Sequence, residues 1–381
     1  MTLSPLPASP PGVPDDLRRT VLAQGQGAMS LFLAFMGISG GLFERLAEAG
    51  ATPAALAATA TLDEGYVRRW CEAAFAFGYL EEADGAYTLA DLGRAFLPST
   101  PGTLMPFAVQ SVLGAHMMER AAGLMHTGER PGESVLAERA TILPWFGPML
   151  EASFGALFER EILPTVPVFA ELDAQGGVAV DLGCGNGWYL RKLAARFANV
   201  RGIGLDGFEE NVRQADAAAR AAGVGERLSF RAGDIHHYTV TEKVALIAMN
   251  RALHHVWDRK ESVFAFLRDS LAPGGAAVIW EPRWPDAVAS LRDPRRRPMA
   301  FQNLSEHVQG NHFLRPAEIE AELRAVGLSP ETFLFAEGNE AVVVGRKARL
   351  PTTAGAAGAL PRGPRAASRS RPSRPASRAP R

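Results

Sequence analysis

The stretch from Gly177 to Leu190, GVAVDLGCGNGWYL, constrains the fold of this chain more than any other. An apolar run ends in Asp181, glycines follow at positions 183, 185 and 187, and residues with helical spacing come next. Closely spaced glycines allow a sharp turn from a strand into a helix, so the pattern is typical of the first strand-turn-helix unit of an open parallel sheet. The backbone amides of such a turn lie at the edge of the sheet where ligands bind.

Strands and helices alternate from Gly177 onward, which predicts the α/β fold class for residues 173–348. We expect strands at about 178–182, 200–205, 227–231, 244–249 and 275–281, and a hairpin at about 331–336 and 340–345. The predicted sheet is Rossmann-like and mostly parallel, with an antiparallel strand from the C-terminal hairpin. A helical domain precedes it.

The remaining chain divides into four parts. Residues 17–100 show helical spacing and then two short extended runs around Asp84-Gly85, which indicates a winged-helix-like helical domain. We expect residues 101–172 to form helices that link the two domains and cover the substrate side of the sheet. Residues 1–16, rich in Pro, and 349–381, rich in Arg, Pro, Ala and Ser, have little to bury and are expected to be disordered.

The charge distribution argues against a nucleic-acid partner. The net charge is −1, but residues 351–381 carry seven Arg and no acidic residue, which leaves −8 for residues 1–350. Residues 41–100 contain nine acidic residues and four Arg, so the winged-helix-like domain would repel a DNA duplex. We therefore expect a structural or dimerising role for that domain, and small-molecule partners for the chain.

Cysteine content and hydropathy bear on the cellular compartment. Cys71 and Cys184 are too few and too far apart for a disulfide framework, which fits a cytoplasmic setting. The most apolar run, residues 28–43, has 16 residues, fewer than the roughly 20 of a membrane span. We predict a buried helix and turn there, and no membrane contact. No secretory signal is expected, because no basic segment precedes an apolar one at the N-terminus.

Acidic residues stand at the ends of successive predicted strands. Asp181 precedes the glycine turn, which departs from the dinucleotide pattern G-x-G-x-x-G because Trp188 occupies the third position. An acid there suits a ligand with ammonium and sulfonium charges better than a pyrophosphate. Asp206 ends the second strand, where a carboxylate can accept hydrogen bonds from ribose hydroxyls. Asp234 and Ile235 offer an acceptor for an adenine amino group and an apolar contact for its ring.

The motifs VDLGCGNG, GLDG, AGDI, ALIAMNRALHHV and LAPGGAAVIWEP follow one another in this order. With them, residues 170–346 resemble the class I S-adenosylmethionine-dependent methyltransferases, which implies S-adenosyl-L-methionine as the cofactor. The implied contacts are Asp181, Gly183, Cys184 and Gly185 to the methionine part, Asp206 and Gly207 to the ribose, Asp234 and Ile235 to the adenine, and Asn250 at the end of the fourth strand. We expect Cys184 to be a small side chain that fits the turn, not a nucleophile.

The helical front part is similar to the winged-helix domain that precedes the catalytic domain in many small-molecule O-methyltransferases. In those enzymes this domain dimerises and closes the substrate cavity. The resemblance implies a homodimer and a small organic methyl acceptor, with oxygen favoured over carbon and nitrogen. Two alternatives stay open: a winged-helix regulator or non-catalytic cofactor sensor, and an RNA or protein methyltransferase that uses the Arg-rich tail as an accessory arm.

The adjacent histidines of LHHVWD leave several roles open. Small-molecule O-methyltransferases place a general base in a segment of the type L-H-D-W-x-D, which this sequence matches only at its Leu, first His and last Asp. His254 is therefore a candidate catalytic base, with lining of the cleft as the alternative. His255, Glu281 and His312 are candidate contacts to the acceptor substrate. No metal site is expected, because adjacent residues rarely chelate one ion.

Overall fold

The structure is a computed structural model that describes residues 12–132, 134–138 and 140–349. The chain up to Ala348 forms one compact unit, to which the following description applies. The tail expected at 349–381 lies outside the described residues except for Arg349, as does the expected disordered N-terminus except for residues 12–16. Within that last segment the prediction is wrong at Asp15 and Asp16, which begin a helix.

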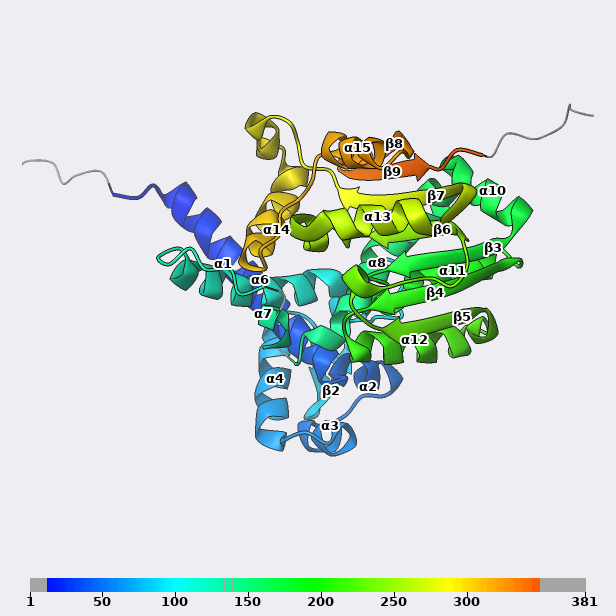
Figure 1. The fold of residues 1–381 in the computed structure, drawn as a ribbon. Coiled ribbons are helices and arrows are strands. Elements are labelled where there is room, and N and C mark those ends of the chain that lie inside the picture. Colours follow the sequence, from blue (N-terminus) through cyan, green and yellow to red (C-terminus); the bar gives the residue numbers. More distant parts are fainter. Residues whose placement is uncertain (1–11, 133, 139, 350–381) are drawn as a thin grey trace, which may run out of the picture. The chain divides into compact units, whose positions relative to one another are not determined.

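A seven-stranded sheet forms the C-terminal half of the compact unit (Figure 1). Its strands are β3 (Gly177–Leu182), β4 (Val200–Asp206), β5 (Leu228–Ala232), β6 (Val244–Asn250), β7 (Leu271–Pro282), β8 (Ser329–Phe335) and β9 (Glu340–Arg346). They lie in the order β5-β4-β3-β6-β7-β9-β8; β3 to β7 are parallel, and β9 pairs antiparallel with β7 and β8. The predicted fold class is confirmed.

Helices cover both faces of the sheet. One face packs against α10 (Pro167–Gln175), α11 (Trp188–Arg196) and α12 (Glu209–Ala221), and the other against α13 (Lys260–Ser270) and α15 (Pro316–Ala325). Alternate residues of a strand serve the two layers, since Ala179 packs in the first apolar cluster and Val180 in the second. The central strands β3 and β6 are therefore apolar up to the polar residues near their ends, whereas the outer strands β5 and β8 also carry exposed polar residues.

Strand β7 begins earlier than predicted. It starts at Leu271 and not near 275, although Pro273 and Gly274 are typical of a turn. The Gly274 N–H donates to the carbonyl of Lys347 (3.1 Å), whose own N–H donates to the carbonyl of Gly275 (2.9 Å). Pairing with a distant segment thus overrides the local turn signal.

The N-terminal half is helical and contains one hairpin. Its elements are α1 (Asp15–Ser39), α2 (Leu42–Glu48), α3 (Pro53–Ala60), α4 (Glu64–Ala76), β1 (Leu80–Ala83), β2 (Ala86–Leu89) and α5 (Asp91–Arg94). Strands β1 and β2 pair antiparallel across Asp84 and Gly85, whose φ angles of 53° and 79° are those that a two-residue hairpin turn requires.

Helix α1 departs from the expected buried helix at residues 28–43. It is 25 residues long, begins at Asp15, and buries only Ala34, Phe35, Gly37 and Ile38. Leu31 and Leu33 are partly buried against the same core, and its other large apolar side chains are exposed, so the helix is less buried than the sequence pattern predicts. Among the described residues, α1 is the one helix whose length and composition suit a membrane, with a mean hydropathy of 1.4 in a window that is 22% buried. The core helix of a soluble protein passes the same test.

Further helices lie between the two halves. They are α6 (Met105–Leu124), α7 (Ser134–Ala137), α8 (Phe146–Leu157), a π-helical turn (Phe158–Ile162) and α9 (Leu163–Thr165). Helix α14 (Arg297–Val308) follows β7 and packs on α6, where a side chain at Gly114 would meet the Phe301 ring at 2.7 Å. At the start of α8, Gly147 lies against Asn186 of the glycine turn. Helix α8 therefore contacts the carboxyl edge of the sheet.

Candidate functional site

A cavity of about 720 Å³ opens at the carboxyl edge of the parallel strands, within the size range of small-molecule sites. All nine residues predicted to contact the cofactor line it: Asp181, Gly183, Cys184, Gly185, Asp206, Gly207, Asp234, Ile235 and Asn250. Its opposite wall comes from residues 143–150 and 309–311. A larger cavity of about 1200 Å³ lies between α1, α4 and α12 and touches none of these nine residues.

The glycine turn has a backbone that other residues would not adopt easily. Gly183, Gly185 and Gly187 have φ angles of 77°, 53° and 73°, all left-handed. A side chain at Gly183 would also meet the Cβ of Ala252 at 2.7 Å. The Gly183 and Cys184 amides donate to the carbonyl of Leu205 (2.8 and 3.0 Å), which fixes the turn to the end of β4.

Asp206 organises the part of the cavity next to this turn. One carboxylate oxygen accepts from the Gly185 N–H (2.8 Å), and the other from the Phe208 N–H (3.0 Å) and the Asn211 side chain (2.9 Å). The side chain is 7% exposed and lines the cavity. Its orientation is therefore set by the protein before any ligand arrives.

Asp181 is a buried acid near the end of β3. It is 1% exposed, and the Asn250 side-chain amide donates to its carboxylate at 3.3 Å. Burial, with a smaller contribution from the nearby Asp206, raises the pKa of Asp181 to about 8. A cationic ligand group beside Asp181 would stabilise the ionised carboxylate. The buried carboxyl of Asp181 therefore fits an ammonium group of a ligand.

Asp234 lies at the rim of the cavity, and its side chain is far more exposed than that of Asp181. Its carboxylate accepts from the His236 N–H (2.9 Å) and lies 3.1 Å from Nδ1 of His237. The backbone hydrogen bond, followed by the charges of the neighbouring basic residues, lowers the pKa of Asp234. It is therefore ionised at neutral pH, and Ile235 beside it supplies an apolar wall.

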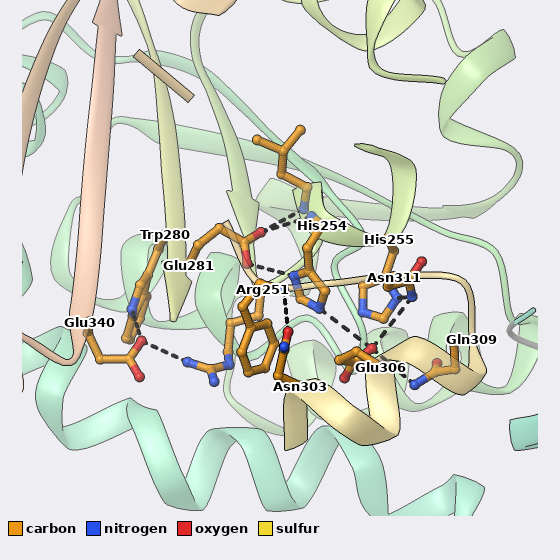
Figure 2. A network of polar contacts seen from close by, with 12 residues as sticks. Arg251, His254, His255, Trp280, Glu281, Asn303, Glu306, Gln309, Asn311 and Glu340 are labelled. Carbon is orange, nitrogen blue, oxygen red and sulfur yellow. Dashed lines mark hydrogen bonds and ion pairs between the residues drawn. The ribbon is translucent and has the colours of Figure 1, made fainter. Parts of the chain in front are cut away.

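The two histidines of LHHVWD lie differently (Figure 2). The His254 ring is 3% exposed and is not among the described residues that line the cavity; its Nδ1 lies 2.6 Å from Oε2 of Glu281. His255 lines the cavity, and its Nδ1 lies 2.8 Å from the Asn311 side-chain amide. The centroids of the two rings are 4.1 Å apart, and the ring planes are tilted by 36°. His255 is thus the histidine on the cavity wall, with His254 behind it.

Glu281 is a structural anchor and does not line the cavity. Its carboxylate also accepts from the backbone N–H groups of Leu253 (2.8 Å) and His254 (3.3 Å). Burial alone would raise the pKa of Glu281, but His254, through its charge and hydrogen bond, and Arg251 hold it below the usual value. Glu281 therefore fixes the segment that carries both histidines.

His312 does not reach the cavity. Its side chain is exposed, and it is not among the described cavity-lining residues, so its predicted contact to the acceptor is not supported by the geometry. The neighbouring Asn311 lines the wall instead, together with Gln309.

Glu306 lies on α14 beside the two histidines, and the sequence did not indicate it as a site residue. Its Oε2 accepts from Gln309 (3.0 Å) and Asn311 (3.5 Å) and lies 3.9 Å from Nε2 of His254. Single ligand atoms of His254, His255 and Glu306 all lie within 4.8 Å of one another. A buried carboxylate therefore lies beside the histidine pair. No local pattern links α14 to the pair, because 51 residues separate Glu306 from His255.

Arg251 is a second residue that the sequence did not single out. Its φ of 53° is unusual for a residue with a side chain, and its N–H donates to the Trp280 carbonyl at 2.7 Å. The guanidinium lies 2.7 Å from Oε2 of Glu340 and over the Phe154 ring at 4.1 Å. Arg251 lines the cavity, but its charge is already balanced by Glu340.

Comparisons with known proteins agree with this geometry. The sequence profile of the methyltransferase domain family matches residues 179–275. The chain is 34% identical over 122 residues to trans-aconitate 2-methyltransferase of Streptomyces avermitilis, which covers 32% of this chain and 44% of that protein. The chain thus spans less than half the length of this curated relative.

Solved structures resemble a larger part of the chain. An O-methyltransferase family protein from Burkholderia thailandensis matches 87% of this chain and 98% of its own, with a TM-score of 0.65 and 17% identity. Human N-acetylserotonin methyltransferase in complex with S-adenosylmethionine matches 88% and 99%, with a TM-score of 0.63 and 19% identity. At such identities the likeness shows the fold, including the helical N-terminal half.

Proposed function

We infer from its class I methyltransferase domain that this chain binds S-adenosyl-L-methionine and transfers the methyl group to a small organic acceptor, with oxygen the favoured acceptor atom. The observation that carries the proposal is the cavity at the strand ends, which gathers the nine predicted cofactor residues from three strands and the loop after β5. Ligands of open α/β sheets bind at this edge.

Each part of the cofactor has a counterpart in the cavity. Asp181 suits the ammonium group, the glycine turn the methionine backbone, and Asp206 the ribose hydroxyls. Asp234 and Ile235 suit the adenine amino group and ring. When bound, the cofactor supplies a methyl group on a positively charged sulfur, which makes it an electrophile. The protein then needs to align the acceptor and exclude water.

The acceptor side is assigned to the wall opposite the glycine turn. His255, Gln309 and Asn311 supply polar groups there, and Leu143, Phe146 and Leu150 supply apolar ones. We assign the direct acceptor contact to His255. His254, the first candidate for a base, is buried behind it with Nδ1 held by Glu281, so we assign it a supporting role.

We also propose that the chain is a homodimer formed through the N-terminal half. Helix α1 exposes six large apolar side chains, which apart from the adjacent pair at 21 and 22 follow one another at intervals of three, four or seven residues: Leu17, Val21, Leu22, Met29, Phe32 and Met36. Such a row is typical of an interface helix. Analytical ultracentrifugation should show a dimer, and the change Leu22→Glu should shift the chain to monomers. A wild-type monomer at tens of micromolar would contradict the proposal.

A cytoplasmic location is proposed from the cysteines. Cys71 and Cys184 are both free thiols in the interior, which suits a reducing compartment.

The experiment for the proposed function has two stages. Calorimetry with S-adenosyl-L-methionine and S-adenosylhomocysteine should show one binding site per chain. The affinity should fall about 100-fold in Asp206→Ala and be unchanged in the control Asp173→Asn, whose side chain is exposed. A labelled-methyl assay with trans-aconitate, phenols and amines then tests transfer. Binding without transfer would favour a cofactor sensor, and the absence of binding would end the proposal.

A further inference from the structure

One stripe of helix α8 packs against the glycine turn and against α11. Gly147, Glu151 and Gly155 follow one another at intervals of four residues, so they lie on the same face of the helix. A Cβ at Gly147 would meet the Cβ of Asn186, in the glycine turn, at 2.5 Å. A Cβ at Gly155 would meet Cε of Lys192, on α11, at 2.8 Å. The absence of side chains at these two positions therefore lets α8 approach the turn closely.

Arg191 of α11 bonds to this stripe and to the glycine turn at the same time. Its Nη2 lies 2.5 Å from Oε2 of Glu151, and its Nη1 donates to the carbonyl of Asn186. The side chain of Arg191 is 11% exposed and that of Glu151 is 35% exposed, so solvent screens the ion pair only in part. A planar guanidinium holds two acceptors in fixed directions. One side chain thus determines how far Glu151 lies from the turn.

The neighbouring stripe of α8, one residue earlier in the sequence, belongs to the acceptor side of the cavity. Phe146 and Leu150 line the cavity, and the ring of Phe154 lies 4.1 Å from the guanidinium carbon of Arg251. Adjacent residues of an α-helix share one hydrogen-bonded turn, so they move together. A contact that fixes Glu151 therefore also fixes Phe146 and Leu150.

We propose that Arg191 and Glu151 are positioning residues for the methyl acceptor. Their ion pair sets the gap between the apolar side chains of α8 and the glycine turn, where the methyl donor would lie. Neither residue is among the described residues that line the cavity, so both act through α8. The kinetic part of this inference rests on the proposed methyl transfer. Shifts of about 1 Å in the alignment of reacting groups reduce turnover strongly, so the width of this gap matters for the reaction.

A second ion pair between the same segments provides a matched control. Nζ of Lys192 lies 2.8 Å from Oε2 of Glu159, in the π-helical turn that continues α8. Glu159 is 52% exposed and lies about two helical turns beyond Glu151, away from the cavity-lining start of α8. If such pairs only held the helix on α11, the loss of either pair would have a similar kinetic effect.

The kinetic test compares the wild type with Glu151→Ala, Glu151→Gln and Glu159→Ala. The acceptor is the best substrate that the labelled-methyl assay finds among trans-aconitate, phenols and amines. In Glu151→Ala, kcat/KM for the acceptor should fall at least about 10-fold. KM should take the larger share, because Phe146 and Leu150 would contact the body of the acceptor and not its reacting atom.

Cofactor binding and the two other variants complete this comparison. The Kd for S-adenosylhomocysteine should stay within about threefold in Glu151→Ala, because Arg191 keeps its hydrogen bond to the glycine turn. Glu151→Gln keeps an accepting oxygen without the charge, so its kcat/KM should lie between those of the wild type and Glu151→Ala. This variant also decides the question if Glu151→Ala fails to fold. Glu159→Ala should match the wild type within about twofold.

The two glycines of the stripe give the same contrast without a change to the ion pair. Gly147→Ala would place a methyl group against the Cβ of Asn186, which cannot move without the backbone of the turn, so kcat/KM should again fall at least about 10-fold. Gly155→Ala would meet only the far end of Lys192, which can turn aside. Its kcat/KM should stay within about twofold of the wild type.

Hydrogen exchange tests the contact without any need for turnover. In the full chain, free and with S-adenosylhomocysteine, the amides of α8 should exchange at least about 10-fold faster in Glu151→Ala than in the wild type. The amides of β6 should keep their rates, which separates a local effect from a general loss of stability. In Glu159→Ala the amides of residues 147–151 should exchange as in the wild type.

The outcomes separate this inference from the proposed function. A wild type that methylates no acceptor would contradict the proposed function, and hydrogen exchange would then decide on the ion pair alone. Unchanged exchange of α8 in Glu151→Ala would overturn the inference whether or not methyl transfer occurs. An unchanged kcat/KM in Glu151→Ala, or an equal loss in Glu159→Ala, would overturn it as well.

Discussion

The two walls of the cavity are built in different ways. On the cofactor wall, Asp181, Asp206 and Asp234 stand at or just after the ends of β3, β4 and β5. Backbone amides orient Asp206 and Asp234, and the Asn250 side chain donates to Asp181. On the acceptor wall, His255 depends on Asn311 and Glu306, which come from α14 and the loop after it. The first wall follows from the sheet itself, whereas the second requires a helix to dock onto it. Changes to the two walls should therefore have separate consequences.

The largest expected effect is on the acceptor wall. Glu281→Ala removes three hydrogen bonds and leaves His254 unpaired in the interior, so the free energy of unfolding should fall by about 3–5 kcal/mol. Urea denaturation of the variant measures it. The matched change Glu261→Ala, at a side chain that is 78% exposed, should cost less than about 0.5 kcal/mol. Equal losses in the two variants would show that Glu281 does not anchor this wall.

The next largest effect is on the cofactor wall. Asp206→Ala should weaken S-adenosylhomocysteine binding about 100-fold, because it removes the ribose acceptor and frees the amides of Gly185 and Phe208. Glu281→Ala, on the other wall, should change this affinity by less than about threefold, since the two walls are independent. Calorimetry on both variants gives the two values. A loss of affinity in Glu281→Ala as large as that in Asp206→Ala would break the distinction between the walls.

These contrasts also explain what the sequence could predict. The strand positions, the hairpin and the nine residues predicted on the cofactor side follow from contiguous motifs, because a strand and the turn after it are read from neighbouring residues. The acceptor side does not, since Glu306 and His255 are adjacent only through the packing of α14 on α6. His254 and Glu281 were recognised as polar residues at strand ends, but their mutual burial depends on the tertiary structure.

A smaller effect should appear as protons released on binding. The pKa of about 8 leaves Asp181 mostly protonated at pH 7 in the free protein, and a bound cationic group lowers it. Binding of S-adenosylmethionine at pH 7 should therefore release a fraction of one proton, which calorimetry in buffers of different ionisation enthalpy detects. Asp181→Asn should abolish the buffer dependence. An unchanged buffer dependence in that variant would assign the proton to another group.

The same raised pKa sets the sign of a stability effect. The folded chain binds the Asp181 proton more tightly than the unfolded chain does. Protonation of Asp181 therefore adds to the free energy of unfolding; this stabilisation is complete below about pH 4 and is lost as the pH rises through 8. Without ligand, Asp181→Asn should therefore be more stable than the wild type at pH 9, and the difference should shrink toward pH 5.

The smallest effect is expected at Cys184. Its side chain fills the space beside Gly204 and Asp181, and burial raises the pKa of its thiol well above the usual value. Cys184→Ala should cost about 1 kcal/mol of stability or less and leave methyl transfer within about twofold. Iodoacetamide should not inactivate the folded protein, because the thiolate is the reactive form. Rapid inactivation that Cys184→Ala prevents would contradict this assignment.

The most direct test of the two-wall account is a crystal structure of the full chain with S-adenosylhomocysteine. The account predicts the ribose on Asp206, the amino group beside Asp181 and the adenine at Asp234 and Ile235, with the sulfur facing His255. Nucleoside density in the larger cavity between α1 and α12, or His254 turned out to the sulfur in place of His255, would contradict it.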